Sequence, residues 1–323
     1  MANEKLLEIK NLTVHYQSYD ATVHAVENLN LSLGNGETLG LVGETGAGKT
    51  TTVKSIMRIL PTPPARVVSG EIFFDGQDLL KVSEKEMRKI RGKEIAMIFQ
   101  DPMTSLNPVM TVADQIAEVI RLHDGGSRAE AHKKACDMLE LVGIRPERGS
   151  DYPHQFSGGM KQRVVIAMAL ACNPEFLVLD EPVSALDVSI QAQVLNLMQQ
   201  LQKDRGLTYL FISHNLSVVK HISDRIAVMY LGRMVELADC KQLFKNPVHP
   251  YTKALLSAVP IPRLDVKTER ILLEGDVPSP VNPAPGCRFA GRCAQCMERC
   301  TAEQPELREI EPGHFVACHL CDR

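Results

Sequence analysis

The sequence predicts an α/β fold built around a largely parallel sheet. Three observations support this prediction. Short apolar runs typical of buried strands occur at residues 37–42, 176–180, 208–213 and 225–229. Segments with helical spacing, such as residues 190–202, separate these runs, as in two-faced parallel sheets. The octapeptide GETGAGKT at residues 43–50 joins the first run to an expected helix at 51–60, and it has the spacing of a phosphate-binding loop.

The remaining segments predict additions to this core. Alternating apolar and polar residues at 7–14 and 25–33, with a hairpin strand at 69–76, predict an antiparallel β subdomain. Residues 93–100 read as a strand that ends at Gln100. Helical spacing at 112–120 and 129–141 predicts an inserted helical subdomain over about residues 105–172.

Composition changes again near residue 265, where prolines precede a cluster of cysteines. We therefore expect a nucleotide-binding domain over residues 1–264. A small cysteine-rich C-terminal extension with little regular structure is expected over residues 265–323.

Bulk properties exclude several classes of protein. The net charge of −3 over 323 residues gives no indication of nucleic-acid binding. The longest apolar run, residues 164–172, is too short for a membrane span, which needs about 20 residues. The N-terminus lacks the basic start and apolar core of a signal peptide. We expect a cytoplasmic protein that reaches a membrane only through partners.

The phosphate-binding loop predicts a nucleotide site. Its glycines allow backbone N–H groups to converge on phosphates, and the N-terminus of the following helix adds its positive dipole end. Lys49 can reach the β- and γ-phosphates, and the Thr50 hydroxyl can ligate Mg²⁺. The expected contacts with the nucleotide are Gly43, Glu44, Thr45, Gly46, Ala47, Gly48, Lys49, Thr50 and Thr51.

Two further motifs carry chemistry. The segment FLVLDEP places Asp180 and Glu181 at the end of a buried strand. There Asp180 can hold Mg²⁺, usually through water, and Glu181 can orient or deprotonate an attacking water. In FSGGMKQR, Ser157 can cap a helix, and Gly158 and Gly159 allow close backbone approach.

In this order, the motifs resemble those of ATP-binding-cassette (ABC) ATPases over residues 5–240. The resemblance implies that Gln100 contacts Mg²⁺ near a membrane partner and that His214 contacts the γ-phosphate. It also implies that the segment containing Asp187 links the two nucleotide sites of a dimer. Tyr16 is a candidate to stack on adenine, the alternative being an ordinary strand aromatic.

The same resemblance implies the mechanism of a head-to-tail dimer that closes on two ATP molecules and opens after hydrolysis. Ser157 and Gly159 would then serve the ATP of the partner. Met160 stands where glutamine is commonest in the family, and we expect activity to survive this change.

Longer matches narrow the resemblance to the dipeptide/oligopeptide/nickel importer group. They lie at residues 101–108, 152–160, 249–256 and 285–293. The resemblance implies an ATP hydrolase on the cytoplasmic face of the membrane that drives peptide import. Its partners would be a second ATPase subunit, two permeases and an extracytoplasmic binding protein, with no nucleic acid.

Several alternatives stay open at this point. Nickel or oligosaccharide cargo is possible, and so is either a homodimer or a pair of related ATPases. Segments 182–193 and 212–219 look closer to the second ATPase of such pairs, whereas 101–108 looks more like the first. Non-transport cassette ATPases of DNA repair carry long coiled coils or nucleic-acid domains, and those of translation usually fuse two cassettes. This chain has neither sustained heptads nor a second phosphate loop.

Six of the nine cysteines lie between Cys287 and Cys321. The cysteines at 287, 293, 300 and 318 have a spacing that resembles the tail of peptide-importer ATPases, where four cysteines can hold a 4Fe–4S cluster. The same ligands suit tetrahedral Zn²⁺, and free thiols are a third possibility. Cys296 and Cys321 lie outside the family pattern and leave the ligand set open.

Overall fold

A computed structural model describes residues 5–259 and 270–322. These residues form two compact units, which we describe separately. The first unit comprises Gly34–Thr38 and Lys81–Ser213, and the second comprises Lys5–Leu33, Leu39–Leu80 and the residues from His214 onward. Both contain helices and strands, so the predicted α/β fold is confirmed.

The second unit contains the phosphate-binding loop and two sheets. One sheet has the order β2-β1-β4-β5, and the other runs β11-β12-β10-β9-β3, with β3 parallel to β9. Its strands are β1 (Lys5–Gln17), β2 (Thr22–Gly34), β3 (Thr38–Val42), β4 (Ala65–Phe74), β5 (Gln77–Asp78), β9 (Arg225–Tyr230), β10 (Arg233–Asp239), β11 (Arg308–Glu311) and β12 (His314–Val316). Every residue of β3 is buried, as its apolar sequence requires.

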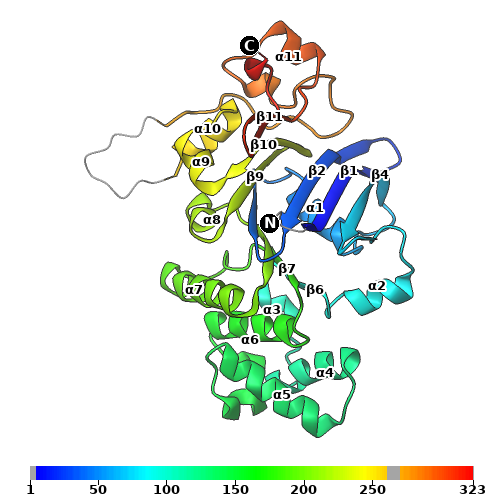
Figure 1. Ribbon diagram of the computed structural model, residues 1–323, viewed down its shortest axis with the longest axis vertical. Helices are drawn as coiled ribbons and strands as arrows, with labels where there is room; N and C mark the ends of the chain where they lie inside the picture. Colours follow the sequence, from blue (N-terminus) through cyan, green and yellow to red (C-terminus); the bar gives the residue numbers. More distant parts are fainter. Residues whose placement is uncertain (1–4, 260–269, 323) are drawn as a thin grey trace, which may run out of the picture. The chain divides into compact units, whose positions relative to one another are not determined.

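Short helices accompany these sheets. They are α1 (Lys49–Ile56), α8 (Leu216–Ile222), α9 (Cys240–Lys245), α10 (Pro250–Ser257) and α11 (Glu298–Ala302), with 3₁₀ turns η3 (Ala290–Arg292) and η4 (His319–Cys321). Figure 1 shows α9 and α10 beside β10, with α11 near the C-terminus.

The first unit contains three parallel strands in the order β8-β7-β6 and a group of helices. Its strands are β6 (Ile95–Ile98), β7 (Phe176–Asp180) and β8 (Thr208–Ile212). Its helical elements are α2 (Glu84–Ile90), α3 (Pro102–Ser105), α4 (Val112–His123), α5 (Arg128–Leu141), η1 (Pro146–Ser150), η2 (Pro153–Gln155), α6 (Gly158–Leu170) and α7 (Val188–Arg205).

Local capping explains where the helices of the first unit begin. The Thr111 hydroxyl accepts the Asp114 N–H before α4, and Ser127 forms a capping box with Glu130 before α5. Ala131, Ala135 and Leu139 form the buried face of α5. In Figure 1, α4 and α5 lie side by side next to α6.

Element boundaries differ from the sequence prediction at several points. The helix after the phosphate loop spans Lys49–Ile56 rather than residues 51–60, because it begins directly at the loop. The predicted strand at 69–76 starts earlier, at Ala65, where it pairs with Tyr16 of β1. Strand β6 ends at Ile98, so Gln100 lies beyond the strand.

The C-terminal extension carries more regular structure than predicted. Strands β11 and β12 form a hairpin, and β12 pairs antiparallel with β10, with Glu236 opposite Val316. The imidazole of His314 contacts the carboxylate of Glu236 at 2.8 Å, and both side chains are fully buried. Strands of three and four residues are too short for their periodicity to be recognised in a sequence.

Across the described ranges, helices that are both long and apolar enough to cross a membrane are absent.

The close packing of β3 on α8 provides a test of the second unit. A Cβ added at Gly40 would lie 2.5 Å from Val219 Cγ1 and 2.6 Å from Ser223 Oγ. We expect Gly40→Ala to lower the free energy of unfolding by about 1–3 kcal/mol through overpacking. Urea denaturation measures this loss. In the control Gly291→Ala, the added Cβ meets open space, and a comparable loss there would contradict the packing argument.

Candidate nucleotide site and cysteine lobe

The phosphate-binding loop between β3 and α1 depends on glycine. Gly43, Gly46 and Gly48 have φ values of 149°, 82° and 99°, which residues with a side chain rarely adopt. A Cβ at Gly43 would overlap the carbonyl oxygen of Met229, and one at Gly48 would lie 2.5 Å from that of Ala25. The loop backbone therefore lies directly against β9 and β2.

Lys49 connects the two ends of this loop. Its ammonium group donates to the carbonyl oxygens of Gly43 at 2.6 Å and Glu44 at 3.0 Å. Because Lys49 is also the first residue of α1, its side chain lies where the helix N-terminus attracts anions. The hydroxyls of Tyr16 and Thr51 lie 3.4 Å apart, which brings the aromatic ring of β1 to the first turn of α1.

Glu44 makes two contacts that sequence reasoning missed. Its backbone N–H donates to the Tyr251 hydroxyl at 2.9 Å. Its carboxylate accepts from both terminal nitrogens of Arg292, at 2.8 and 3.4 Å. The sequence offered one indication of the ion pair. Glu44 is acidic and lies inside a loop expected to bind anions, so its charge favours a cationic partner.

The first unit brings together two candidate catalytic residues. Asp180 is the last residue of buried strand β7, and Glu181 follows with φ 51°. Such a left-handed conformation costs about 1–2 kcal/mol for a residue with a side chain. The Gln100 side-chain amide donates to Glu181 Oε2 at 2.9 Å, so a residue 81 positions away orients this carboxylate.

His214 belongs to the second unit, unlike Gln100 and Glu181. It directly precedes Asn215, whose side chain accepts the N–H groups of Ser217 and Val218 and so caps α8.

The Ser-Gly-Gly segment and Asp187 also lie together in the first unit. The Ser157 hydroxyl accepts the Met160 N–H at 3.4 Å and starts α6. Asp187 accepts the Ile190 N–H at 3.0 Å and starts α7. A Cβ on Gly159 would overlap the Ile190 side chain, so this glycine allows the two helix starts to meet. Ser157, Gly158 and Asp187 are all exposed.

Residues 286–322 form a compact segment that we call the cysteine lobe. Four of its cysteines, Cys287, Cys293, Cys300 and Cys318, line one small cavity together with Phe289 and His319. Cys296 is exposed, and Cys321 does not line this cavity. The four cysteines that line this cavity are those at positions 287, 293, 300 and 318 of the sequence pattern.

The thiols of the lobe are held in a poorly solvated setting. Burial raises the pKa of Cys287 to about 11 and that of Cys318 to about 12. A metal centre at this position would therefore have to displace thiol protons on binding.

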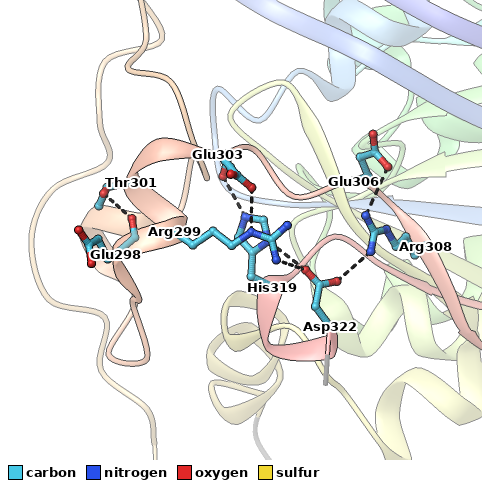
Figure 2. Close-up of polar contacts among 8 residues, drawn as sticks. All are labelled: Glu298, Arg299, Thr301, Glu303, Glu306, Arg308, His319 and Asp322. Atoms are coloured by element: carbon cyan, nitrogen blue, oxygen red, sulfur yellow. Dashed lines mark hydrogen bonds and ion pairs between the residues drawn. The ribbon is translucent and has the colours of Figure 1, made fainter.

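Polar contacts fix the segments that carry Cys300 and Cys318. Figure 2 shows the Asp322 carboxylate between two arginines, with Arg299 at 2.8 Å and Arg308 at 3.1 Å. Its carboxylate also contacts the imidazole of His319, whose Nε2 lies 3.0 Å from the Glu303 carbonyl oxygen. Arg299 precedes Cys300 and His319 follows Cys318, so this network links the segments that carry these two cysteines.

Groups of three closely spaced metal-ligand atoms are rare among the described residues. Among the described residues, three candidate metal ligands lie within 4.8 Å of one another only at His15, His24 and Glu27. No three sulfurs of the described cysteine lobe meet this limit. In the group of His15, His24 and Glu27, the Glu27 carboxylate already pairs with Arg233 and Arg288.

Comparison with known proteins finds two matching family models. Residues 26–184 match the family model for the ABC transporter, and residues 235–300 match the model for the oligopeptide/dipeptide transporter, C-terminal region.

Similar relatives cover nearly the whole chain. The putative oligopeptide transport ATP-binding protein YkfD of Bacillus subtilis (strain 168) is 52% identical over 320 residues, which is 98% of this chain and 95% of YkfD. The oligopeptide transport ATP-binding protein AppF of the same organism is 48% identical, with 98% of each chain covered.

Solved structures match the cassette. The ATP-binding cassette MJ0796, a dimer bound to ADP and Pi in a post-hydrolysis state, has a TM-score of 0.65 and 28% identity, covering 72% of this chain and 98% of that one. CbiO1 from Clostridium perfringens, part of the ABC transporter complex cbiONQ, has a TM-score of 0.66 and 28% identity, covering 75% and 92%. The chain therefore belongs to the ABC transporter family of ATP-binding proteins, in the group that carries the oligopeptide/dipeptide transporter C-terminal region.

Proposed function

We propose that this chain is the ATP-hydrolysing subunit of an ABC importer for dipeptides or oligopeptides. The main support is that a glycine-dependent phosphate loop and the oligopeptide/dipeptide C-terminal region occur in one chain. The names of YkfD and AppF, whose similarity extends over 98% of the chain, support peptides over nickel or oligosaccharides as the cargo.

The proposed roles follow the chemistry of each side chain. Within residues 43–51, the backbone N–H groups other than that of Glu44, which donates to Tyr251, bind the phosphates together with the Lys49 ammonium. The oxygens of Thr50, Gln100 and Asp180 suit Mg²⁺, which would neutralise charge on the β- and γ-phosphates. Glu181, oriented by the Gln100 amide, orients or deprotonates the attacking water.

The other proposed contacts lie around these groups. The ring of Tyr16, held near Thr51, stacks on adenine. His214 contacts the γ-phosphate. Ser157, Gly158 and Gly159 present a capped helix N-terminus to the ATP of a partner cassette, and Asp187 at the neighbouring helix start links the two sites.

The proposal extends to assembly and domain layout. Residues 1–264 form the nucleotide-binding domain, with residues 105–172 as a helical subdomain that contacts a membrane partner, and residues 265–323 form the extension. The chain works at the cytoplasmic face of the membrane with a second ATPase subunit, two permeases and an extracytoplasmic binding protein.

We further propose that Cys287, Cys293, Cys300 and Cys318 hold a 4Fe–4S cluster with a structural role. Four thiolates suit either an iron–sulfur cluster or tetrahedral zinc. We favour the cluster because the four cysteines that line one cavity are those whose sequence spacing resembles the cluster-binding tails of peptide-importer ATPases, and zinc is the alternative.

The role of Glu181 predicts an ATP-trapped variant. Glu181→Gln removes the base but keeps an oxygen for the Gln100 amide, so we expect normal ATP binding and at least about a hundredfold lower turnover. Phosphate release and gel filtration with ATP measure turnover and dimer trapping. Glu175→Gln, at the other end of β7, is the matched control. Full turnover in Glu181→Gln would refute the assigned role.

The role of Lys49 predicts loss of nucleotide affinity. Lys49→Ala removes the cation that spans the loop, and we expect ATP affinity to fall at least about tenfold. Titration with a fluorescent ATP analogue measures this change, with Lys54→Ala on the same helix as the control. Unchanged ATP affinity in Lys49→Ala would count against the phosphate site.

The cluster proposal predicts the metal content of the chain. After anaerobic purification, we expect about four irons and four acid-labile sulfides per chain. Cys300→Ser should lose both, whereas Cys296→Ser, altered outside the four-cysteine cavity, should keep both. Elemental and sulfide analysis provide the measurement. One zinc per chain without sulfide would overturn the cluster and leave the ATPase proposal intact.

A further inference from the structure

Glu44 takes part in several of the bonds that hold the phosphate loop. Its carbonyl oxygen accepts from the Ala47 N–H at 3.1 Å and from the Lys49 ammonium at 3.0 Å. Together with the bond from Lys49 to the Gly43 carbonyl oxygen at 2.6 Å, these bonds close the loop on itself. Whatever fixes the peptide groups of Glu44 therefore also fixes the position of the lysine that meets the phosphates.

Two residues from the C-terminal part of the second unit fix Glu44. The Tyr251 hydroxyl, from α10, accepts its backbone N–H at 2.9 Å. Arg292, from the cysteine lobe, donates hydrogen bonds to its carboxylate from both terminal nitrogens, at 2.8 and 3.4 Å. One contact holds the main chain and the other holds the side chain, so Glu44 cannot rotate freely.

The two residues are themselves held in place. The rings of Tyr230, Tyr251 and Phe289 pack against one another with centroids 4.7–5.5 Å apart, and all three are buried. Arg292 also donates to the Tyr230 hydroxyl at 3.3 Å. The exposed fraction of the Arg292 side chain is only 9%, so its charge is poorly screened by water.

We propose that Arg292 and Tyr251 are positioning residues for ATP binding: they hold Glu44, and through it the phosphate loop, in the shape that receives the triphosphate. Arg292 has a second effect, because its charge compensates a carboxylate that would otherwise repel the phosphates of the nucleotide. This proposal rests on ATP binding by the phosphate loop.

The proposed charge compensation predicts that changing Arg292 weakens ATP binding more than changing Glu44. Arg292→Gln leaves Glu44 uncompensated, and we expect the dissociation constant for ATP to rise about tenfold. Glu44→Gln removes the repulsion together with the ion pair, so its effect should be at most about threefold. The double variant Glu44→Gln/Arg292→Gln should recover most of the affinity lost in Arg292→Gln.

The proposed positioning of Glu44 predicts that even conservative changes of Arg292 and Tyr251 weaken ATP binding. Arg292→Lys keeps the charge but loses the bidentate contact with the Glu44 carboxylate, and should weaken ATP binding only about threefold. Tyr251→Phe keeps the aromatic cluster but leaves the Glu44 N–H without its acceptor, and should weaken binding about fivefold. In all these variants KM for ATP should rise more than kcat falls, since none of the altered groups is assigned to the chemical step.

Arg288→Gln is the matched control. Arg288 comes from the same lobe and pairs with a cassette glutamate, but that glutamate is Glu27 on β2, outside the phosphate loop. We expect Arg288→Gln to bind ATP like the wild type, even where it lowers the melting temperature.

The experiment is equilibrium titration of the full-length chain with fluorescent ATP and Mg²⁺, accompanied by thermal melts. Wild-type affinity in both Arg292→Gln and Tyr251→Phe would overturn the proposal. So would equal losses in Arg288→Gln and Arg292→Gln, or a double variant no better than Arg292→Gln. If the wild type itself failed to bind ATP, the proposed function would be refuted instead. Lys49→Ala, which we expect to bind ATP weakly, provides the reference for that outcome.

Discussion

The phosphate loop has to fold back over its own lysine, and the second unit is built around this constraint. The loop reaches that shape only because Gly43 and Gly48 tolerate left-handed backbone and close approach. The close approach is to β9 and to the N-terminal part of β2, whose carbonyl oxygens occupy the space that side chains would need. The N–H of Gly232 completes the arrangement by donating to the Ala47 carbonyl oxygen. Backbone of β2 and β9 therefore lies directly next to the loop.

Much of this could be predicted from the sequence, because the signals were local. The loop, its lysine and the following helix occupy consecutive positions, and Ser157 and Asp187 cap helices that start immediately after them. Contacts that join distant segments could not be predicted. Glu44 and Arg292 are 248 positions apart, and nothing in the spacing of either residue indicates the other. The β11–β12 hairpin was missed for a different reason, since its strands are stabilised by pairing with β10 and by the buried Glu236–His314 contact.

The cysteine lobe illustrates how a segment with few apolar residues becomes ordered. It has only a small core of its own, in which Phe289 and Val316 are almost completely buried. Besides the pairing of β12 with β10, its attachment to the rest of the second unit combines three kinds of side-chain contact. The ring of Phe289 joins the aromatic cluster, Arg288 and Arg292 each pair with a glutamate, and the Glu236 carboxylate accepts the N–H groups of Val248 and His249 while contacting His314. A thiolate-bound cluster would add a fourth kind of contact, within the lobe itself.

The pairing of β12 with β10 has a consequence for any shortened form of the chain. A fragment that stops before the cysteine lobe would leave the outer side of β10 without its hydrogen-bonding partner. Most of that strand is buried, and four residues of its sequence, RMVELAD, are apolar. An uncovered edge of this kind is a template for association with other chains. The lobe therefore also covers this edge, and a minimal cassette obtained by simple truncation would expose it to pairing with other chains.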